Sequence, residues 1–142
     1  MTPLKIEYTE NLSADANNTM TAGQEKYERD NGVAINFKEF AFVLSNENGE
    51  IFGVLNAYTA YAEIYIEDLW VDESVRRMGY GKQLVQALEN HFRGKGYNNI
   101  NLVTNQFQAP GFYKKCGYEV EFIRVNKTNS KLTKTFFIKY LE

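Results

Sequence analysis

The chain has 142 residues, of which 44% are hydrophobic and 24% are charged, a balance that is ordinary for a globular domain with its own core. The formal net charge of −2 argues against general nucleic-acid binding, and no apolar run approaches the length that spans a membrane. A single cysteine, Cys116, excludes an internal disulfide, and the first residues lack a signal-peptide core. We therefore expect one cytoplasmic domain over residues 1–142 that binds neither nucleic acid nor membranes.

The N-terminal part of the sequence predicts a strand followed by helix. Residues 4–8 alternate apolar and polar side chains, which is typical of a β-strand. Residues 11–31 are polar with sparse apolar positions, so we predict one or two loosely packed helices there. The charged side chains of this segment, among them Glu25, Glu28 and Asp30, indicate either a solvated helix face or one wall of a ligand site.

Three strands that form a meander are predicted next, over residues 40–44, 51–59 and 64–71. Their aromatic and β-branched residues favour strands. Asn48 and Gly49 lie between the first two strands, and Asn-Gly is a strong hairpin signal because both residues tolerate a positive φ. The meander should deliver the chain to the glycine-containing stretch that follows it.

A helix with one buried face is predicted after that stretch. Val85, Leu88 and Phe92 recur at the i, i+3, i+7 spacing, and Leu84 precedes Leu88 by four residues. This spacing places the four apolar side chains on one side of a helix.

The entrance of this helix has the features of an anion site. Gly79 and Gly81 allow an anion to approach the backbone closely. The first helical turn leaves N–H groups without partners at the positive end of the macrodipole. Arg76, Arg77 and Lys82 add full positive charges. The stretch therefore predicts a phosphate or pyrophosphate site between a strand and a helix.

The rest of the chain predicts a parallel crossover and a final hairpin. Residues 100–104 read as a fifth strand, and strand, helix and strand in this order suggest a right-handed parallel crossover. A short helix follows, with Pro110 in its first turn and Gly117 at its C-terminal cap. Residues 118–123 and 135–141 predict two last strands, which makes seven strands in all.

Two motifs resemble signatures of one family. The pattern Arg-x-x-Gly-x-Gly at residues 76–81 resembles the pyrophosphate-binding signature of the GNAT superfamily, the acetyl-CoA-dependent N-acetyltransferases. A P-loop would need Ser or Thr where Gln83 stands, and a dinucleotide fingerprint would need glycine where Leu84 stands. Residues 109–118 resemble the segment Ala-x-x-Phe-Tyr-x-Lys-x-Gly-Phe/Tyr that follows the fifth strand of GNAT enzymes.

The resemblance is to a small single-domain bacterial-type member, and it covers the chain from about residue 40 but not residues 11–36. It implies an α/β fold with a mixed, mostly antiparallel seven-stranded sheet and helices on both faces. The fourth and fifth strands would splay apart into a cleft for the pantetheine arm of acetyl-CoA, the acyl donor, and no metal is implied. The implied cofactor-binding residues are Leu69, Trp70, Val71, Arg76, Arg77, Met78, Gly79, Tyr80, Gly81, Lys82, Asn105, Ala109 and Tyr113.

The same resemblance suggests Tyr113 and Glu67 as catalytic residues. Tyr113 matches the tyrosine that protonates the departing thiolate in many of these enzymes, although a half-buried core tyrosine would also fit the position.

Glu67 and Asp68 are adjacent on a strand and should face opposite sides, so whichever faces the cleft could take a proton from the amine, directly or through water. We favour Glu67, and a carboxylate that only pairs with a cation is the alternative. We interpret His91 as structural and Cys116 as a packed thiol.

The function that the resemblance implies is acetyl transfer from acetyl-CoA to a primary amine of a small molecule or a protein. Two alternatives stay open: a non-catalytic acyl-CoA-binding or sensing module, and a plain nucleotide-binding domain. Acidic residues would suit a cationic acceptor such as a polyamine, an aminoglycoside or a lysine side chain, whereas the many aromatic residues equally allow an aromatic amine. Both a monomer and a homodimer are compatible with the sequence.

Overall fold

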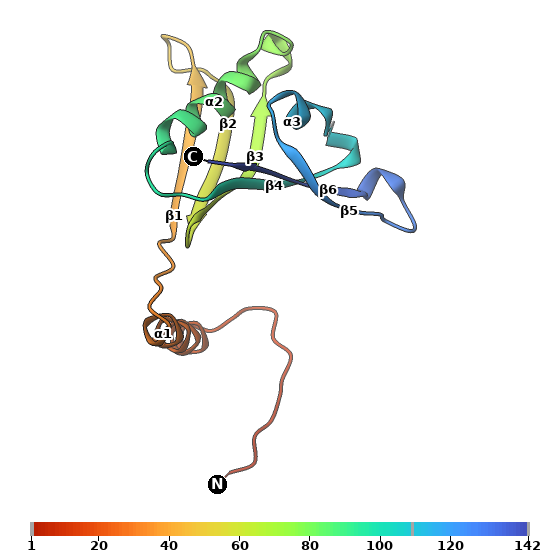
Figure 1. Ribbon diagram of the computed structural model, residues 1–142. Coiled ribbons are helices and arrows are strands. Elements are labelled where there is room, and N and C mark those ends of the chain that lie inside the picture. The colour runs from red at the N-terminus through yellow and green to blue at the C-terminus, as the bar shows by residue number, and fades with distance from the viewer. Residues whose placement is uncertain (1, 109, 142) are drawn as a thin grey trace. The chain divides into compact units, whose positions relative to one another are not determined.

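The structure, a computed structural model, describes residues 2–108 and 110–141. Its contacts divide the chain into two compact units, Met1–Ile35 and Asn36–Glu142, which are considered separately (Figure 1). The prediction of a single domain over residues 1–142 stays a prediction. Within the described residues, no helix is long and apolar enough to cross a membrane.

The N-terminal unit contains one helix, α1 (Ala14–Asp30). Ser13 caps it, because its side chain accepts a hydrogen bond from the backbone N–H of Ala16 at 3.1 Å. The predicted strand at residues 4–8 is wrong, since these residues form no strand. Alternation marks a segment that could be a strand, but a strand forms only where the backbone finds a partner to pair with.

The second unit is built on a six-stranded sheet with the order β1-β2-β3-β4-β6-β5 (Figure 1). All neighbouring strands are antiparallel except β3 and β4, which are parallel, so the predicted mixed, mostly antiparallel sheet is confirmed. The count of seven strands is wrong for the described residues, because residues 4–8 do not join the sheet. The strands are β1 (Lys38–Ser45), β2 (Ile51–Ala60), β3 (Glu63–Val71), β4 (Asn99–Asn105), β5 (Glu119–Arg124) and β6 (Lys134–Tyr140).

Two helices connect the strands around the site. Helix α2 (Tyr80–Phe92) carries the chain from β3 to the parallel strand β4, as the crossover prediction requires. Helix α3 (Gly111–Lys115) follows β4, its C-cap is Cys116, and Gly117 comes directly after the cap with a φ of +88°. Three short 3₁₀ helices complete the unit: η1 (Glu73–Val75), η2 (Gln106–Gln108) and η3 (Ser130–Leu132). The start of α2 contacts α3 where Gly81 meets Phe112. The prediction of helices on both faces of the sheet stays a prediction.

The core lies between the sheet and α2. Leu88 of α2 and Leu55, Ile64, Ile100 and Phe137 of four strands are fully buried. Burial of each such side chain stabilises the fold by roughly 1.5–3 kcal/mol. The predicted apolar face of the helix is confirmed, because Leu84, Val85 and Leu88 are all buried there.

The ladders around β3 are interrupted in two ways. Opposite β2, Asp68 pairs with Asn56 and Ile66 pairs with Ala57, so Glu67 between them is a bulge residue without a partner. Opposite β4, pairing is limited to three residue pairs, the last of which joins Tyr65 to Asn101. The C-terminal half of β3 is therefore paired with β2 but not with β4.

Candidate active site

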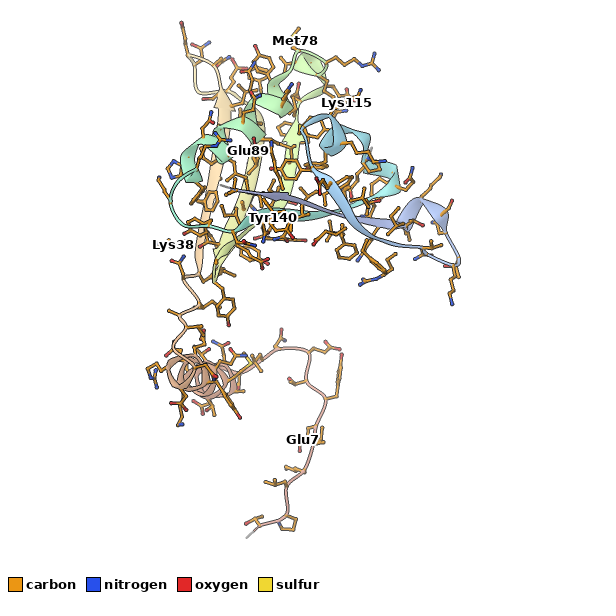
Figure 2. The ribbon with its side chains drawn as sticks, viewed as in Figure 1. Glu7, Lys38, Met78, Glu89, Lys115 and Tyr140 are labelled. Atoms are coloured by element: carbon orange, nitrogen blue, oxygen red, sulfur yellow. The ribbon has the colours of Figure 1, made fainter. Side chains whose placement is uncertain are left out.

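One cleft of about 1030 Å³ lies where the ladder between β3 and β4 stops. It continues past the loop before α2 to α3, and Figure 2 labels Met78 in this loop and Lys115 at the end of α3. Its lining residues are 66–71, 75–77, 79–82, 102–104, 107–108, 112–113 and 115–116.

At one end of the cleft, the N-terminus of α2 has free backbone donors. Gly79 is the N-cap with a φ of +86°, and no side chain caps the helix. The first backbone bond back to the cap is the one from the N–H of Gln83 to the carbonyl of Gly79 at 3.0 Å. The N–H groups of the three residues before Gln83 therefore have no acceptor within the helix. With no acidic residue in the first turn, this helix end suits an anion.

Cationic side chains surround this helix end. The Nε of Arg76 donates a hydrogen bond to the carbonyl of Val71 at 2.8 Å, which ties the loop to the end of β3 and leaves the other guanidinium nitrogens for further partners. Arg77 lines the cleft with a φ of +66°, a conformation that costs a non-glycine residue roughly 1–2 kcal/mol. The carboxylate of Asp72 accepts hydrogen bonds from the backbone and hydroxyl of Ser74, which lower its pKa. Asp72 is thus engaged with Ser74 in η1.

Gly81 brings the start of α2 against α3. A Cβ placed there would lie 3.2 Å from two ring carbons of Phe112, which is tighter than nine in ten Cβ contacts. At Gly79, by contrast, a Cβ would meet no atom within 4 Å. The two positions therefore require glycine for different reasons. Gly81 lets the start of α2 pack closely against α3, and Gly79 adopts a left-handed backbone conformation.

Tyr113 lies on α3 with 8% of its surface exposed, and it lines the cleft. Its ring packs against Phe112 and Phe137, with centroids 5.1 and 5.7 Å away. Burial, with a smaller contribution from Cys116, raises the pKa of Tyr113 to about 12. The phenol is therefore protonated at neutral pH and has a proton to donate.

Two carboxylates lie at the β3 bulge. Glu67 and Asp68 both line the cleft, and Asp68 accepts a hydrogen bond from the Nδ2 of Asn56 at 3.2 Å. Burial, the neighbouring Tyr58 and the charges of both carboxylates raise the pKa of Tyr65. A bulge interrupts the strict alternation of side chains, so the expectation that Glu67 and Asp68 face opposite sides of the sheet stays a prediction. Within residues 2–108 and 110–141, neither carboxylate forms an ion pair.

Comparison with known proteins agrees with this geometry. The sequence model of the acetyltransferase (GNAT) family matches residues 7–118. The chain belongs to the acetyltransferase (GNAT) family. A crystal structure of an acetyltransferase from Bacillus cereus ATCC 14579 is 33% identical, with a TM-score of 0.78 over 95% of this chain and 98% of that chain. The mixed sheet with its helices is therefore a GNAT-like fold.

Two curated GNAT relatives match shorter segments. The blasticidin-S acetyltransferase of Streptomyces morookaense is 33% identical over 82 residues, which are 57% of this chain and 60% of the relative. Glucosamine 6-phosphate N-acetyltransferase 1 of Oryza sativa subsp. japonica is 35% identical over 54 residues, which are 38% of this chain and 32% of the relative. The matches thus span less than two thirds of either relative.

Most of the residues implied by the GNAT resemblance lie in the cleft, and two do not. Met78 is 63% exposed and does not line the cleft. The backbone N–H and the side-chain amide of Asn105 both donate to the Oε1 of Gln108, at 2.9 and 3.0 Å, so Gln108 rather than Asn105 reaches the cleft. Ala109 lies outside the described residues. The predicted residues that line the cleft are Glu67, Leu69, Trp70, Val71, Arg76, Arg77, Gly79, Tyr80, Gly81, Lys82 and Tyr113.

Several residues that line the cleft are not predicted from the sequence. Phe112 and Lys115 belong to the second GNAT motif, so the motif itself could have indicated them. Thr104 and Gln108 lie at the end of β4 and in η2, and nothing in their local sequence distinguishes them from ordinary polar residues. His91 stacks edge-on against Phe42, with ring centroids 5.8 Å apart, and does not line the cleft. The described residues contain no group of three potential metal ligands.

The raised pKa of Tyr113 predicts a change of stability at alkaline pH. A tyrosine whose pKa is 10 when unfolded and about 12 when folded stabilises the fold fully below pH 10, and this contribution disappears as the pH rises to about 12. We expect the free energy of unfolding to fall by about 2–3 kcal/mol over this window on account of Tyr113 alone. Urea unfolding of the wild type and Tyr113→Phe across the window measures it. Equal losses of stability in the two proteins would contradict the prediction.

Proposed function

We propose that this chain transfers the acetyl group of acetyl-CoA to a primary amine. The observation that carries the proposal is the composition of the cleft between β3 and β4. It has unpaired backbone donors and cations at one end, a protonated buried tyrosine on one wall and two carboxylates at a strand bulge. Membership in the GNAT family supports the same reaction.

The cleft residues fit acetyl-CoA as the donor. The free N–H groups of Tyr80, Gly81 and Lys82, together with the cations of the loop, would hold the pyrophosphate. The backbone of residues 69–71 would pair with the amide groups of the pantetheine arm, since this half of β3 has no partner in β4. We propose that this opening between β3 and β4 is the splayed cleft that the GNAT resemblance implies.

The bound donor supplies a thioester carbonyl that an amine can attack. A new C–N bond forms, the C–S bond breaks, and CoA leaves as a thiolate that needs a proton. In the proposed reaction, Glu67 accepts the proton that the ammonium group of the acceptor must lose before attack, directly or through water. The nitrogen loses a second proton as the amide forms, and this proton balances the one that the thiolate takes up. Tyr113 donates to the departing sulfur, the role for which its protonated phenol and its place in the cleft are suited.

The surroundings of Glu67 support a cationic acceptor. Glu67 and Asp68 carry two negative charges beside the tilted ring pair of Tyr58 and Tyr65, whose centroids are 5.3 Å apart. Carboxylates and aromatic faces both attract an ammonium group. The two curated relatives are named for small amino-group acceptors, blasticidin S and glucosamine 6-phosphate. We therefore propose a small cationic amine as the acceptor.

Isothermal titration with acetyl-CoA, CoA and ATP tests the donor. We expect acetyl-CoA and CoA to bind with micromolar affinity and ATP to bind far more weakly, because ATP lacks the pantetheine arm. Equal affinity for ATP would favour a plain nucleotide-binding domain instead. CoA release is then measured with an amine panel of blasticidin S, glucosamine 6-phosphate, spermidine, kanamycin and a lysine peptide. Tight acetyl-CoA binding without turnover of any amine would favour an acyl-CoA-binding module.

The two bulge carboxylates offer a matched test of the base. We expect Glu67→Gln to lower kcat about tenfold, less than a general base usually contributes, because water or Asp68 can take the proton in part. Asp68→Asn should change kcat by less than about threefold, since Asp68 already accepts a hydrogen bond from Asn56. Rates with the best amine of the panel, measured across pH, check both variants. A larger loss in Asp68→Asn than in Glu67→Gln would assign the base to Asp68.

A further inference from the structure

An ion pair between a buried carboxylate and a half-buried ammonium group, whose side chain is 29% exposed, connects α2 to β6, and neither of its residues lines the cleft. Glu89 of α2, labelled in Figure 2, is only 4% exposed. Both of its carboxylate oxygens lie 3.1 Å from the Nζ of Lys139 on β6. The hydroxyl of Tyr118 donates a third hydrogen bond to Glu89 at 3.0 Å. The carboxylate thus holds a cation and a phenol in fixed positions.

The same cation also holds the end of α3. The Nζ of Lys139 donates a hydrogen bond to the carbonyl of Cys116 at 3.1 Å. Gly117 follows with a φ of +88°, and a Cβ there would lie 3.5 Å from that Nζ. A side chain larger than a methyl group at residue 117 would therefore compete with Lys139 for the space beside Cys116.

The two residues held by this pair are bonded to the backbone of Tyr113. The carbonyl of Tyr113 accepts the N–H of Cys116 at 3.1 Å and the N–H of Tyr118 at 3.0 Å. The rings of Tyr113 and Tyr118 are 6.0 Å apart and edge-on. Lys139 is bonded to Cys116 and Glu89 to Tyr118, so two chains of hydrogen bonds link the pair to the backbone of Tyr113.

We propose that Glu89 and Lys139 are positioning residues that hold Tyr113 at a fixed distance from the phosphate-binding end of α2. The inference rests on the proposed function, in which Tyr113 acts on the sulfur of a donor bound at that end. Glu89 lies nine residues after Tyr80, about 13 Å along the helix, and neither Glu89 nor Lys139 lines the cleft. It acts only through the segment that carries Tyr113.

Stability alone does not account for such a pair. The buried carboxylate of Glu89 loses its hydration, the half-buried Lys139 keeps part of its own, and replacing such a pair by apolar residues of similar volume is often close to neutral. The bonds from this pair instead reach the two residues that hold the carbonyl of Tyr113. An orienting role explains this choice of partners, because small displacements of a catalytic group reduce rates strongly.

The test replaces the whole polar network by apolar groups. In the triple variant Glu89→Met/Tyr118→Phe/Lys139→Met, no charge or side-chain hydroxyl of the network is left without a partner. We expect it to unfold at a temperature close to that of the wild type and to bind acetyl-CoA with a Kd within about threefold. Its kcat for CoA release with the amine panel should fall about 10- to 100-fold. A stable triple variant with wild-type kcat would overturn the inference.

Two further comparisons of kcat distinguish a positioning role of the pair from a general loss of structure. Lys139→Arg keeps the charge and the donors and should retain most of the kcat that Lys139→Met loses. In a Tyr113→Phe background, the triple substitution should have little further effect on kcat, because both changes remove the same contribution. An undiminished loss in that background would overturn the inference while leaving the proposed function intact. Failure of the proposed function is seen separately, as absence of acetyl-CoA binding or turnover in the wild type.

Discussion

Replacing Tyr113 by phenylalanine is expected to lower kcat by about 100-fold and to leave the Kd for acetyl-CoA within about threefold. The buried phenol has a pKa of about 12, so it stays protonated over the whole working range of pH. Complete transfer of its proton to a thiolate whose thiol has an ordinary pKa near 8.5 is uphill by about 5 kcal/mol. Tyr113 should therefore stabilise the developing thiolate mainly by a hydrogen bond, which places the loss at the low end of the range for acid catalysis.

A tyrosine outside the cleft provides the matched control for this experiment. The hydroxyl of Tyr97 accepts a hydrogen bond from the Nδ2 of Asn36 at 3.0 Å, and its ring packs on Phe92. Tyr97→Phe should leave kcat and the acetyl-CoA Kd unchanged within about twofold. Steady-state rates, calorimetric Kd values and thermal unfolding are compared for the three proteins. Equal kcat values in Tyr113→Phe and the wild type would leave Tyr113 as a packed core residue.

The part of the site that could be predicted from the sequence depends on neighbours in the chain. A strand, a left-handed glycine, a helix N-terminus and nearby cations all fall within residues 69–82, so spacing alone brings them together. The apolar spacing of Leu84, Val85 and Leu88 was equally local and correctly predicted the buried face of α2. Local signals of this kind need no knowledge of the tertiary fold.

The features that escaped prediction depend on partners far away in the chain. Residues 4–8 have the pattern of a strand, but pairing decides whether a strand forms. The bulge at Glu67 is a mismatch of register with β2, which no pattern within β3 reveals. Asn105 turns to Gln108 because η2 follows β4 immediately, so the amide that reaches the cleft is three residues from the predicted one. The network of Glu89 and Lys139 joins residues 50 positions apart.

Gly79→Glu is expected to weaken acetyl-CoA binding by at least about 100-fold, the largest effect on binding that we predict for a single substitution. The new side chain would stand at the N-cap of α2, in space that is open to the cleft, and its carboxylate would compete with an anion for the free N–H groups. Close like charges would add repulsion to this competition. Gly79→Ala carries the backbone penalty without the charge and should weaken binding far less, by about tenfold or less.

Gly94→Glu is the matched control for Gly79→Glu, because it introduces the same side chain at another left-handed glycine, away from the anion site. Gly94 has a φ of +78°, a Cβ there would meet no atom within 4 Å, and it lies just after α2, at the end remote from Gly79. Gly94→Glu should therefore lose about the same folding stability as Gly79→Glu, roughly 1–2 kcal/mol, and keep its affinity for acetyl-CoA. Calorimetric titration and urea unfolding of both variants measure the two quantities. Wild-type affinity in Gly79→Glu would mean that the glycine loop is only a turn, and the donor site would then have to lie elsewhere in the chain.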